Sequence, residues 1–524
     1  MHDFVFRLLV LGFINFIKNQ DTYKIMPYYE EIEWEILQHE RVFKDYEWTF
    51  EFPFKMMKIK EVKINRDEFY NISLEIKCFA NEKIPEEIKQ FEVIEFIRIK
   101  SKCSSDEYLI KNLNISRYTS YYENSMTFLN IYLSATTLLF NPENDDNVAW
   151  IKEWYLNGPT SKIIFPRATT YSKKEIYEKI LDYPVPELRE GSKFKREMEK
   201  NEAVSLNYIF CKLNDVENII IGKVPDKMNP KWSTNISISY NSEKYINDKN
   251  LRGNIENIIS FVFGRKLVKI GESYYDSKGN KIKEKIYNPI INEKLNIKNI
   301  CASANNLPIP VHKYHPKDME LIIRDLINSF TEKDIDFSSM FTNYWNSSFL
   351  PTESRIILLA ASLESMKNKW FESQNSKSKG VIIDKPLFKI LIKDIKNSFD
   401  LIFGDCKMIK DNFGGINRLS INKGFEVFFE EIGMEFGEVE LEAIKARNKP
   451  VHGNDIDSET YRDLIIYTEV YQILVNRAIL TLLGFDGLYH IHDFVDSVQI
   501  SDKIPYSLKD LREDIYQLKS YDID

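Results

Sequence analysis

The pattern of apolar residues changes near residue 305. From about Trp48 to Ile290 apolar and polar residues mostly alternate, whereas beyond residue 305 the apolar residues follow the period of a helix. Alternation is typical of half-buried strands, and the longer period is typical of amphipathic helices. Pro308, Pro310 and Pro316 mark the change, as in a linker. We therefore expect an α+β protein, in which a β-rich domain over residues 1–305 precedes an all-α helical bundle over residues 306–524.

Several strands and one helix are expected in the N-terminal domain. Residues from Ile72 to Cys78 alternate between apolar and polar side chains, which predicts a strand. A helix is expected over residues 254–263, with Gly264 at its C-terminal end. This half contains no GxGxxG, GxxxxGK[ST], GxSxG or HExxH signature, so no ligand of the domain is predicted. Further strands are expected over residues 91–100, 127–134 and 235–240, and a hairpin over residues 274–286.

Composition limits the partners and the compartment of the protein. The chain has 524 residues, of which 43% are hydrophobic and 29% charged, and its formal net charge is −8. This negative balance means that any nucleic-acid binding must be local. The cysteines are dispersed and form no CxxC pair, which favours reduced thiols in a cytoplasmic protein over disulfides or a zinc site. They are Cys78, Cys103, Cys211, Cys301 and Cys406.

The N-terminus contains the one stretch that suggests a membrane. Residues 4–17 are apolar except for Arg7 and Asn15, which falls short of the roughly 20 residues that span a bilayer. The stretch also lacks a basic segment before it and a small-residue cleavage site after it. We expect a cytoplasmic protein with no membrane association. Met26 is an alternative start, in which case residues 1–25 are a misassigned N-terminus.

Long helices are expected throughout the C-terminal domain. They are predicted over residues 317–330, 354–372, 385–403 and 424–447, the last with a break near Gly433 or Gly437, and from residue 457 or 458 to 483. The second helix should turn one apolar stripe toward the core, with Leu363 at the edge of that stripe. The stripe consists of Ile357, Leu358, Ala361, Met366 and Trp370.

The segment from Arg447 to Gly453 joins the last two predicted helices. Arg presents a charged planar fork to phosphate, and His exchanges a proton near neutral pH. The spacing of Arg447 and His452 arises by chance about once in a chain of this composition, so its context matters. No other Arg and His in the chain are spaced in this way, Asn448 supplies an amide after the arginine, and Pro450 ends or kinks the preceding helix. The segment is therefore a candidate phosphate-handling site.

These features resemble a HEPN domain, a family of four-helix bundles. Its ribonuclease members carry an Arg, a polar residue, about three further residues and then a His. Arg447, Asn448 and His452 match those positions, and the resemblance covers roughly residues 310–490. The Leu363-Glu364 pair and the β-rich domain upstream further resemble the Apea-like HEPN proteins of bacterial antiphage (abortive infection) defence.

The resemblance implies a metal-independent endoribonuclease that needs no cofactor. RNA supplies its own nucleophile, the 2′-OH, so the products would carry a 2′,3′-cyclic phosphate and a 5′-OH, and DNA would not be cut. His452 would act as general base or acid, and Arg447 would stabilise charge on the phosphate. Asn448 would orient the histidine or the phosphate. Glu364 would tether Arg447 or His452, although an ordinary glutamate at the rim of the bundle is the alternative.

The resemblance also implies partners. Because the chain holds one Arg–His motif, a homodimer through the helical domain is expected to assemble the complete site. The substrate would be RNA, with transfer RNA as one candidate, and an unknown phage-derived trigger would act on the N-terminal domain. Residues 355–396 contain nine Lys or Arg against four Asp or Glu, which suits a surface that faces RNA. Residues 426–442 are acidic and should face away from it.

Two alternatives stay open. In the first, the HEPN domain is non-catalytic, and Arg447 and His452 serve the hydrogen bonding of the bundle or a surface for nucleotides, RNA or another protein. In the second, a CRISPR-associated sensor of ring nucleotides is fused to a HEPN domain. The absence of a Rossmann-like βαβ pattern near the N-terminus counts against the second. The histidine pairs at 312/315 and 490/492 have no nearby Cys, which favours surface residues over metal ligands.

Overall fold

The computed structural model describes residues 40–510 apart from 52–57, 80–92, 173–202, 290–299, 301–306, 374–381, 404–416, 448–457, 491–496 and a number of gaps of four residues or fewer. The expected fold class is confirmed, because a β-rich N-terminal region is followed by a mainly helical C-terminal region. The described residues form two compact units that are not continuous in sequence. Residues 159–166 and 250–267 precede the expected boundary at residue 305 and cluster with the helices.

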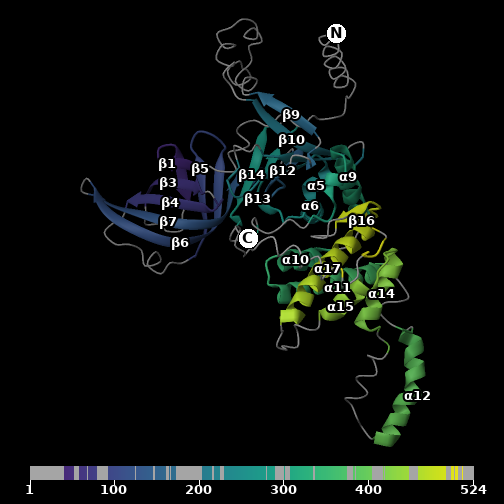
Figure 1. Cartoon of the computed structure of the whole chain (residues 1–524). Helices are drawn as coiled ribbons and strands as arrows, with labels where there is room; N and C mark the ends of the chain where they lie inside the picture. Colours follow the sequence, from purple (N-terminus) through teal and green to yellow (C-terminus); the bar gives the residue numbers. More distant parts are fainter. Residues whose placement is uncertain are drawn as a thin grey trace, which may run out of the picture. The chain divides into compact units, whose positions relative to one another are not determined.

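The sheet unit contains one sheet of fourteen antiparallel strands among the described residues (Figure 1). The strands expected from alternation are confirmed as β4, β5, β7 and β12, and the expected hairpin as β13 and β14. The strands are β1 (Glu40–Lys44), β2 (Trp48–Glu51), β3 (Lys58–Arg66), β4 (Ile72–Phe79), β5 (Val93–Ser101), β6 (Glu107–Glu123), β7 (Met126–Phe140), β8 (Trp150–Leu156), β9 (Arg167–Ser172), β10 (Ala203–Lys212), β11 (Asn218–Lys223), β12 (Ile236–Tyr240), β13 (Val268–Tyr275) and β14 (Lys281–Tyr287). The short helix α5 (Glu243–Asn247) also belongs to this unit.

The first half of the sheet curls back on itself. Its order is β1-β3-β4-β7-β6-β5-β2, so β1 and β2 lie at opposite ends although only residues 45–47 join them. Side chains from the two ends meet in an aromatic cluster. The rings of Phe43 and Trp48 lie 5.0 Å apart, edge to face, and both contact Tyr108 on β6. Such aromatic pairs add to the stability that the burial of their area provides.

The long strand β7 connects the two halves of the sheet. One of its edges pairs with β4 through residues 128–135 and with β14 through residues 137–140, while β6 pairs along the other edge. The second half follows in the order β14-β13-β8-β12-β11-β10-β9. Arg66 of β3 also joins the halves, because its buried guanidinium donates to the carbonyl oxygens of Ile270 at 2.7 Å and Tyr287 at 3.2 Å. Burial lowers the pKa of Arg66 to about 10.

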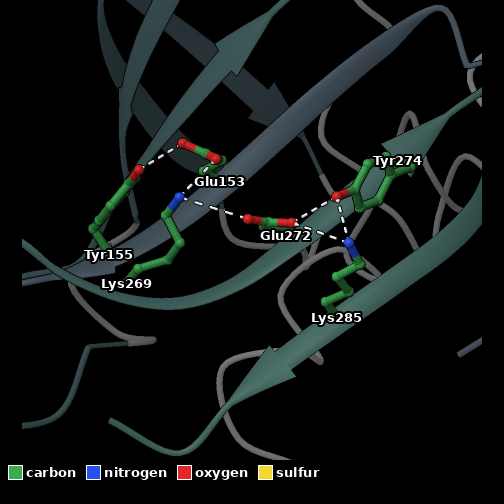
Figure 2. A network of polar contacts seen from close by, with 6 residues as sticks. All are labelled: Glu153, Tyr155, Lys269, Glu272, Tyr274 and Lys285. Carbon is green, nitrogen blue, oxygen red and sulfur yellow. Dashed lines mark hydrogen bonds and ion pairs between the residues drawn. The ribbon is translucent and has the colours of Figure 1, made fainter. Parts of the chain in front are cut away.

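Buried charges in the second half are matched across neighbouring strands (Figure 2). Glu153 of β8 and Glu272 of β13 are buried, and each accepts a hydrogen bond of 2.6 Å from a tyrosine two residues further along its own strand. The ammonium group of Lys269 lies 2.7 Å from the carboxylate of Glu153 and 3.6 Å from that of Glu272. Lys285 lies 3.8 Å from Glu272. Two lysines thus accompany two carboxylates, as the cost of burying unpaired charge requires.

The helices expected from the sequence are confirmed. The helix expected over residues 424–447 is divided in two where Gly433 adopts a positive φ of 75°. The unit also contains a 3₁₀ turn (Val311–Lys313) and a two-stranded sheet of β15 (Leu488–His490) and β16 (Ser497–Gln499). The helices of this unit are α6 (Lys249–Val262), α9 (Pro316–Lys333), α10 (Ser338–Ser347), α11 (Thr352–Ser373), α12 (Lys385–Phe403), α14 (Ile421–Ile432), α15 (Glu438–Ala446) and α17 (Ser458–Leu482).

Helix α17 is the centre of this unit. It packs against α11, α14, α15 and β15, and nearly every residue from Leu464 to Leu483 is buried. Figure 1 shows it running past α10, α11 and α15. Helix α6 lies between two strands in sequence but joins this helical core, because the ring of Phe261 contacts the rings of Phe341 and Tyr344 on α10. The core of the unit is thus assembled from distant parts of the chain.

The buried face of α11 differs from the predicted stripe. Ile357 is 39% exposed, and Leu363, expected at the edge, is fully buried. Met366 is buried as predicted, and Ile356 and Leu359, which were not in the predicted stripe, are buried as well. Apolar residues lie on both sides of α11, and its partners α10 and α17 select the side that is covered. Within the described residues, the length and apolar character that a bilayer-spanning helix needs are not found together in any helix.

Candidate functional site

Arg447 directly follows α15. Its φ of −53° and ψ of −27° continue the helical conformation one residue beyond Ala446. The helix begins at Glu438, and the carboxylate of Glu440 accepts a hydrogen bond of 3.0 Å from the Gly437 N–H, which satisfies one of the free donors at a helix start. Arg447 is 8% exposed, so its guanidinium is held among neighbouring side chains.

Glu364 of α11 lies beside Arg447. Its Oε2 is 3.8 Å from Nη1 of Arg447, which is an ion-pair contact but too long for a hydrogen bond. The Glu364 side chain is 40% exposed, so the pair reaches the surface. The structure therefore brings together two of the residues singled out in the sequence. A contact between Glu364 and His452 stays a prediction.

A second cation, Lys367, lies one helical turn beyond Glu364. Its Nζ is 4.0 Å from Oε1 of Glu364, and its side chain is 9% exposed. Burial lowers the pKa of Lys367, Arg447 lowers it further, and Glu364 opposes both. Two cations therefore share one carboxylate, and neither forms a close ion pair with it.

The ring of Phe425 and the hydroxyl of Tyr471 complete this group. Phe425 of α14 is buried, with Nζ of Lys367 at 4.6 Å and Cζ of Arg447 at 5.8 Å from its ring centroid, both within cation–π range. Tyr471 of α17 is 0% exposed, and burial raises its pKa against the opposing effect of Arg447. Its hydroxyl lies near Arg447 but forms no hydrogen bond of ordinary geometry with any described residue. We call these five residues the Arg447 cluster: Glu364, Lys367, Phe425, Arg447 and Tyr471.

The Arg447 cluster has the chemistry of an anion site. Its formal charge is +1, since Lys367 and Arg447 outnumber Glu364. Lys and Arg offer only hydrogen-bond donors, and the Tyr471 hydroxyl offers a further one. Low exposure around the cations strengthens their attraction for an anion relative to that of surface residues. The arrangement suits a phosphate group that approaches from the exposed side of Glu364.

Asn448 and His452 lie outside the described residues. The proton-transfer role predicted for His452 and the orienting role predicted for Asn448 therefore stay predictions. So does the effect of Pro450, which falls in the same gap.

Two donors of the cluster were missed in the sequence. Lys367 follows Glu364 by three residues, a spacing that places side chains on one helix face, so a signal for it was present. Tyr471 lies among apolar residues of the last helix, and nothing in the sequence marks it as a donor. Phe425 carries no sequence signal for this role, because only the packing of α14 brings its ring under the two cations.

A second ionic contact of the helical unit has a different character. Arg477 of α17 donates to Glu440 of α15 at 3.1 Å, and both side chains are 0% exposed. The Ile504 N–H donates to the same carboxylate at 2.8 Å, and Arg477 donates to the carbonyl of Glu435 at 2.7 Å. We call Glu440 and Arg477 the Glu440 pair. It fastens α15, α17 and the segment near Ile504 together, which is a structural role.

Among the described His, Cys, Asp and Glu residues, no group of three or more is arranged to hold a metal ion. Comparison with known proteins adds no family to this description. No protein-family model, curated protein or solved structure matches the chain.

Proposed function

We propose that the helical unit is a metal-independent endoribonuclease of the HEPN type that acts in antiphage defence. Arg447 stabilises the charge that develops on the phosphate, and His452 moves the proton of the attacking 2′-OH. The products carry a 2′,3′-cyclic phosphate and a 5′-OH. The observation that supports this proposal best is the position of Arg447, which is nearly buried yet 3.8 Å from its carboxylate partner. Its guanidinium is oriented but retains donors for a phosphate.

The complete active site is proposed to need two copies of the chain. A single Arg–His motif supplies one half, and a homodimer through the helical unit would bring two halves to one RNA. The sheet unit would receive the phage-derived trigger and restrain the nuclease until then. Transfer RNA is a reasonable substrate because it exposes single-stranded loops, which proteins recognise more readily than RNA duplexes.

The test compares His452→Ala with the wild-type protein. Cells that produce the wild type should stop growing once it is activated, and their RNA should acquire new 5′-OH ends. His452→Ala should abolish both effects at unchanged thermal stability. His315→Ala is the matched control because His315 is an exposed histidine of the same unit, and it should behave as the wild type. RNA cleavage by His452→Ala at the wild-type rate would contradict the proposal.

A non-catalytic module is the second candidate function. It is favoured by the low exposure of Arg447 and by its contact with Glu364, which also suit a residue that stabilises the bundle or binds nucleotides without cutting them. Under this alternative, RNA binds to the wild type and to His452→Ala with equal affinity, and neither protein generates new RNA ends.

A further inference from the structure

We propose that Lys367 and Tyr471 join Arg447 to form a three-donor site for a phosphate group. The site shares Arg447 with the proposed nuclease and in that respect rests on the proposed function. It adds two residues outside the Arg–His motif, Lys367 of α11 and Tyr471 of α17. The ligand chemistry is a phosphate monoester or diester, and the sources to be distinguished are free phosphate and the RNA backbone.

The first reason is that the charges of the Arg447 cluster are incompletely matched. Glu364 lies 4.0 Å from Lys367 and 3.8 Å from Arg447, so it forms a hydrogen bond with neither cation. Two like charges are thus held side by side in a poorly solvated place, and a bound anion would relieve their repulsion. Phosphate carries enough negative charge and enough acceptor oxygens to bind both cations at once.

The second reason is the buried hydroxyl of Tyr471. Its side chain is 0% exposed, and its oxygen lies near the guanidinium of Arg447, which can only donate hydrogen bonds. The hydroxyl proton therefore has no acceptor among the described residues. A buried donor without a partner is costly, so such groups in folded proteins call for an explanation. A phosphate oxygen held by Arg447 would give the hydroxyl an acceptor.

The third reason is that the cluster reaches solvent at Glu364 and that an aromatic ring contacts both of its cations. Glu364 is 40% exposed, so the cluster reaches solvent on the side of this carboxylate. The buried ring of Phe425 contacts both cations, with Lys367 Nζ at 4.6 Å and Arg447 Cζ at 5.8 Å from its centroid. The donors are therefore positioned before the ligand arrives, which reduces the entropy lost on binding.

The experiment measures phosphate binding by the full-length protein with isothermal titration calorimetry. Two probes are used, inorganic phosphate and a 2′-O-methyl RNA octamer, which cannot be cut because it lacks the 2′-OH nucleophile. Lys367→Met should weaken the binding of both probes by about ten- to a hundredfold, the loss expected for one hydrogen bond to a charged group. Tyr471→Phe should weaken it by about three- to tenfold, as for a neutral donor.

Lys369→Met is the matched control. Lys369 lies two residues further along α11 and has the same kind of contact with a glutamate three residues away, 3.3 Å from Glu372, but its side chain is 41% exposed. Its substitution should leave the affinity for inorganic phosphate within about twofold of the wild type, as befits an exposed charge outside the cluster. Circular dichroism and thermal unfolding check that every variant is folded, and Lys367→Arg, which keeps the charge, should retain measurable binding.

Several outcomes would overturn the proposal. They are absence of binding of both probes to the wild type, unchanged affinity in Lys367→Met, and equal losses in Lys367→Met and Lys369→Met. Binding of inorganic phosphate without the octamer assigns the site to free phosphate, and binding of both assigns it to the RNA backbone. The proposed nuclease activity is tested separately from this phosphate site. Lys367-dependent phosphate binding without RNA cleavage leaves this site intact, whereas cleavage that needs His452 but not Lys367 removes only this site.

Discussion

The Arg447 cluster and the Glu440 pair both include a residue of α17 and a charged residue in or directly after α15, yet they use their charges in opposite ways. In the Glu440 pair the oppositely charged atoms lie 3.1 Å apart at 0% exposure, and backbone groups fill further hydrogen-bonding positions. In the Arg447 cluster the corresponding distances are 3.8 and 4.0 Å, and the carboxylate is 40% exposed. The charges of the Glu440 pair are closely hydrogen-bonded, whereas the cations of the Arg447 cluster lie farther from their carboxylate.

This difference distinguishes charged residues that stabilise the fold from charged residues that can bind a ligand. A buried ion pair compensates its desolvation cost only when geometry and additional hydrogen bonds are good, and the Glu440 pair meets this condition. In the lysine–glutamate–tyrosine network of the sheet, each carboxylate accepts a tyrosine hydrogen bond of 2.6 Å, and Lys269 adds one of 2.7 Å to Glu153 (Figure 2). The Arg447 cluster does not meet this condition, since two cations share one distant carboxylate. Perturbed groups that are not explained by structure are candidates for function.

The largest expected effect is in the Glu440 pair. Arg477→Met should lower the free energy of unfolding of the helical unit by about 3–5 kcal/mol, because it leaves the Glu440 carboxylate buried without its cation. The measurement is urea unfolding followed by circular dichroism. The double variant Glu440→Gln/Arg477→Met should recover part of this loss, since it removes the unpaired charge. A loss below about 1 kcal/mol in Arg477→Met, the range of surface pairs, would contradict the structural role of the pair.

A smaller effect is expected at Glu364. Because its contacts are long and half-exposed, Glu364→Gln should change the free energy of unfolding by less than about 1 kcal/mol. The same substitution removes the carboxylate that competes with an anion. Phosphate should then bind up to about fivefold more tightly, the equivalent of about 1 kcal/mol. Calorimetric titration with inorganic phosphate checks this prediction, and weaker binding would show that Glu364 supports the ligand rather than competing with it.

The architecture was largely predictable from the sequence because hydrophobic period is a local property. Strands such as β4 and the full extent of α12, Lys385–Phe403, follow from alternation or helical spacing within a few neighbouring residues. The buried side of α11 did not follow, because its sequence offers apolar residues on two sides and distant helices select between them. The place of α6 did not follow either, since a helix flanked by strands in sequence gives no sign that it packs with α10.

The candidate site was predictable only in part, for the same reason. Arg447 was found through a local motif and Glu364 through a family resemblance. Lys367 could have been found from its helical spacing to Glu364. Tyr471 and Phe425 come from two other helices, and the packing of α14 and α17 against α11 places them near the cations. Such side chains are defined by tertiary contacts that no short stretch of sequence contains.

The smallest expected effect is the pH dependence of phosphate binding. Burial lowers the pKa of Lys367 below its ordinary value of 10.5, and Arg447 adds to the shift while Glu364 opposes it. Lys367 therefore loses its proton at a lower pH than an exposed lysine, and the neutral amine no longer attracts phosphate. The affinity of the wild type and of Lys369→Met should fall as the pH rises toward 10.5, whereas Lys367→Arg, which stays charged, should show a flatter profile in calorimetric titrations.

The lowered pKa of Lys367 also makes the free energy of unfolding depend on pH. Between the lowered pKa of folded Lys367 and 10.5, the unfolded chain holds this proton more tightly, so unfolding takes up a proton. The contribution of Lys367 to the free energy of unfolding therefore rises with pH in that window. Lys367→Met lacks this contribution, so its stability relative to the wild type should decline over the same interval in urea unfolding. A difference between the two proteins that is constant with pH would place the Lys367 charge in water, and the contrast with the buried Glu440 pair would then lose its basis.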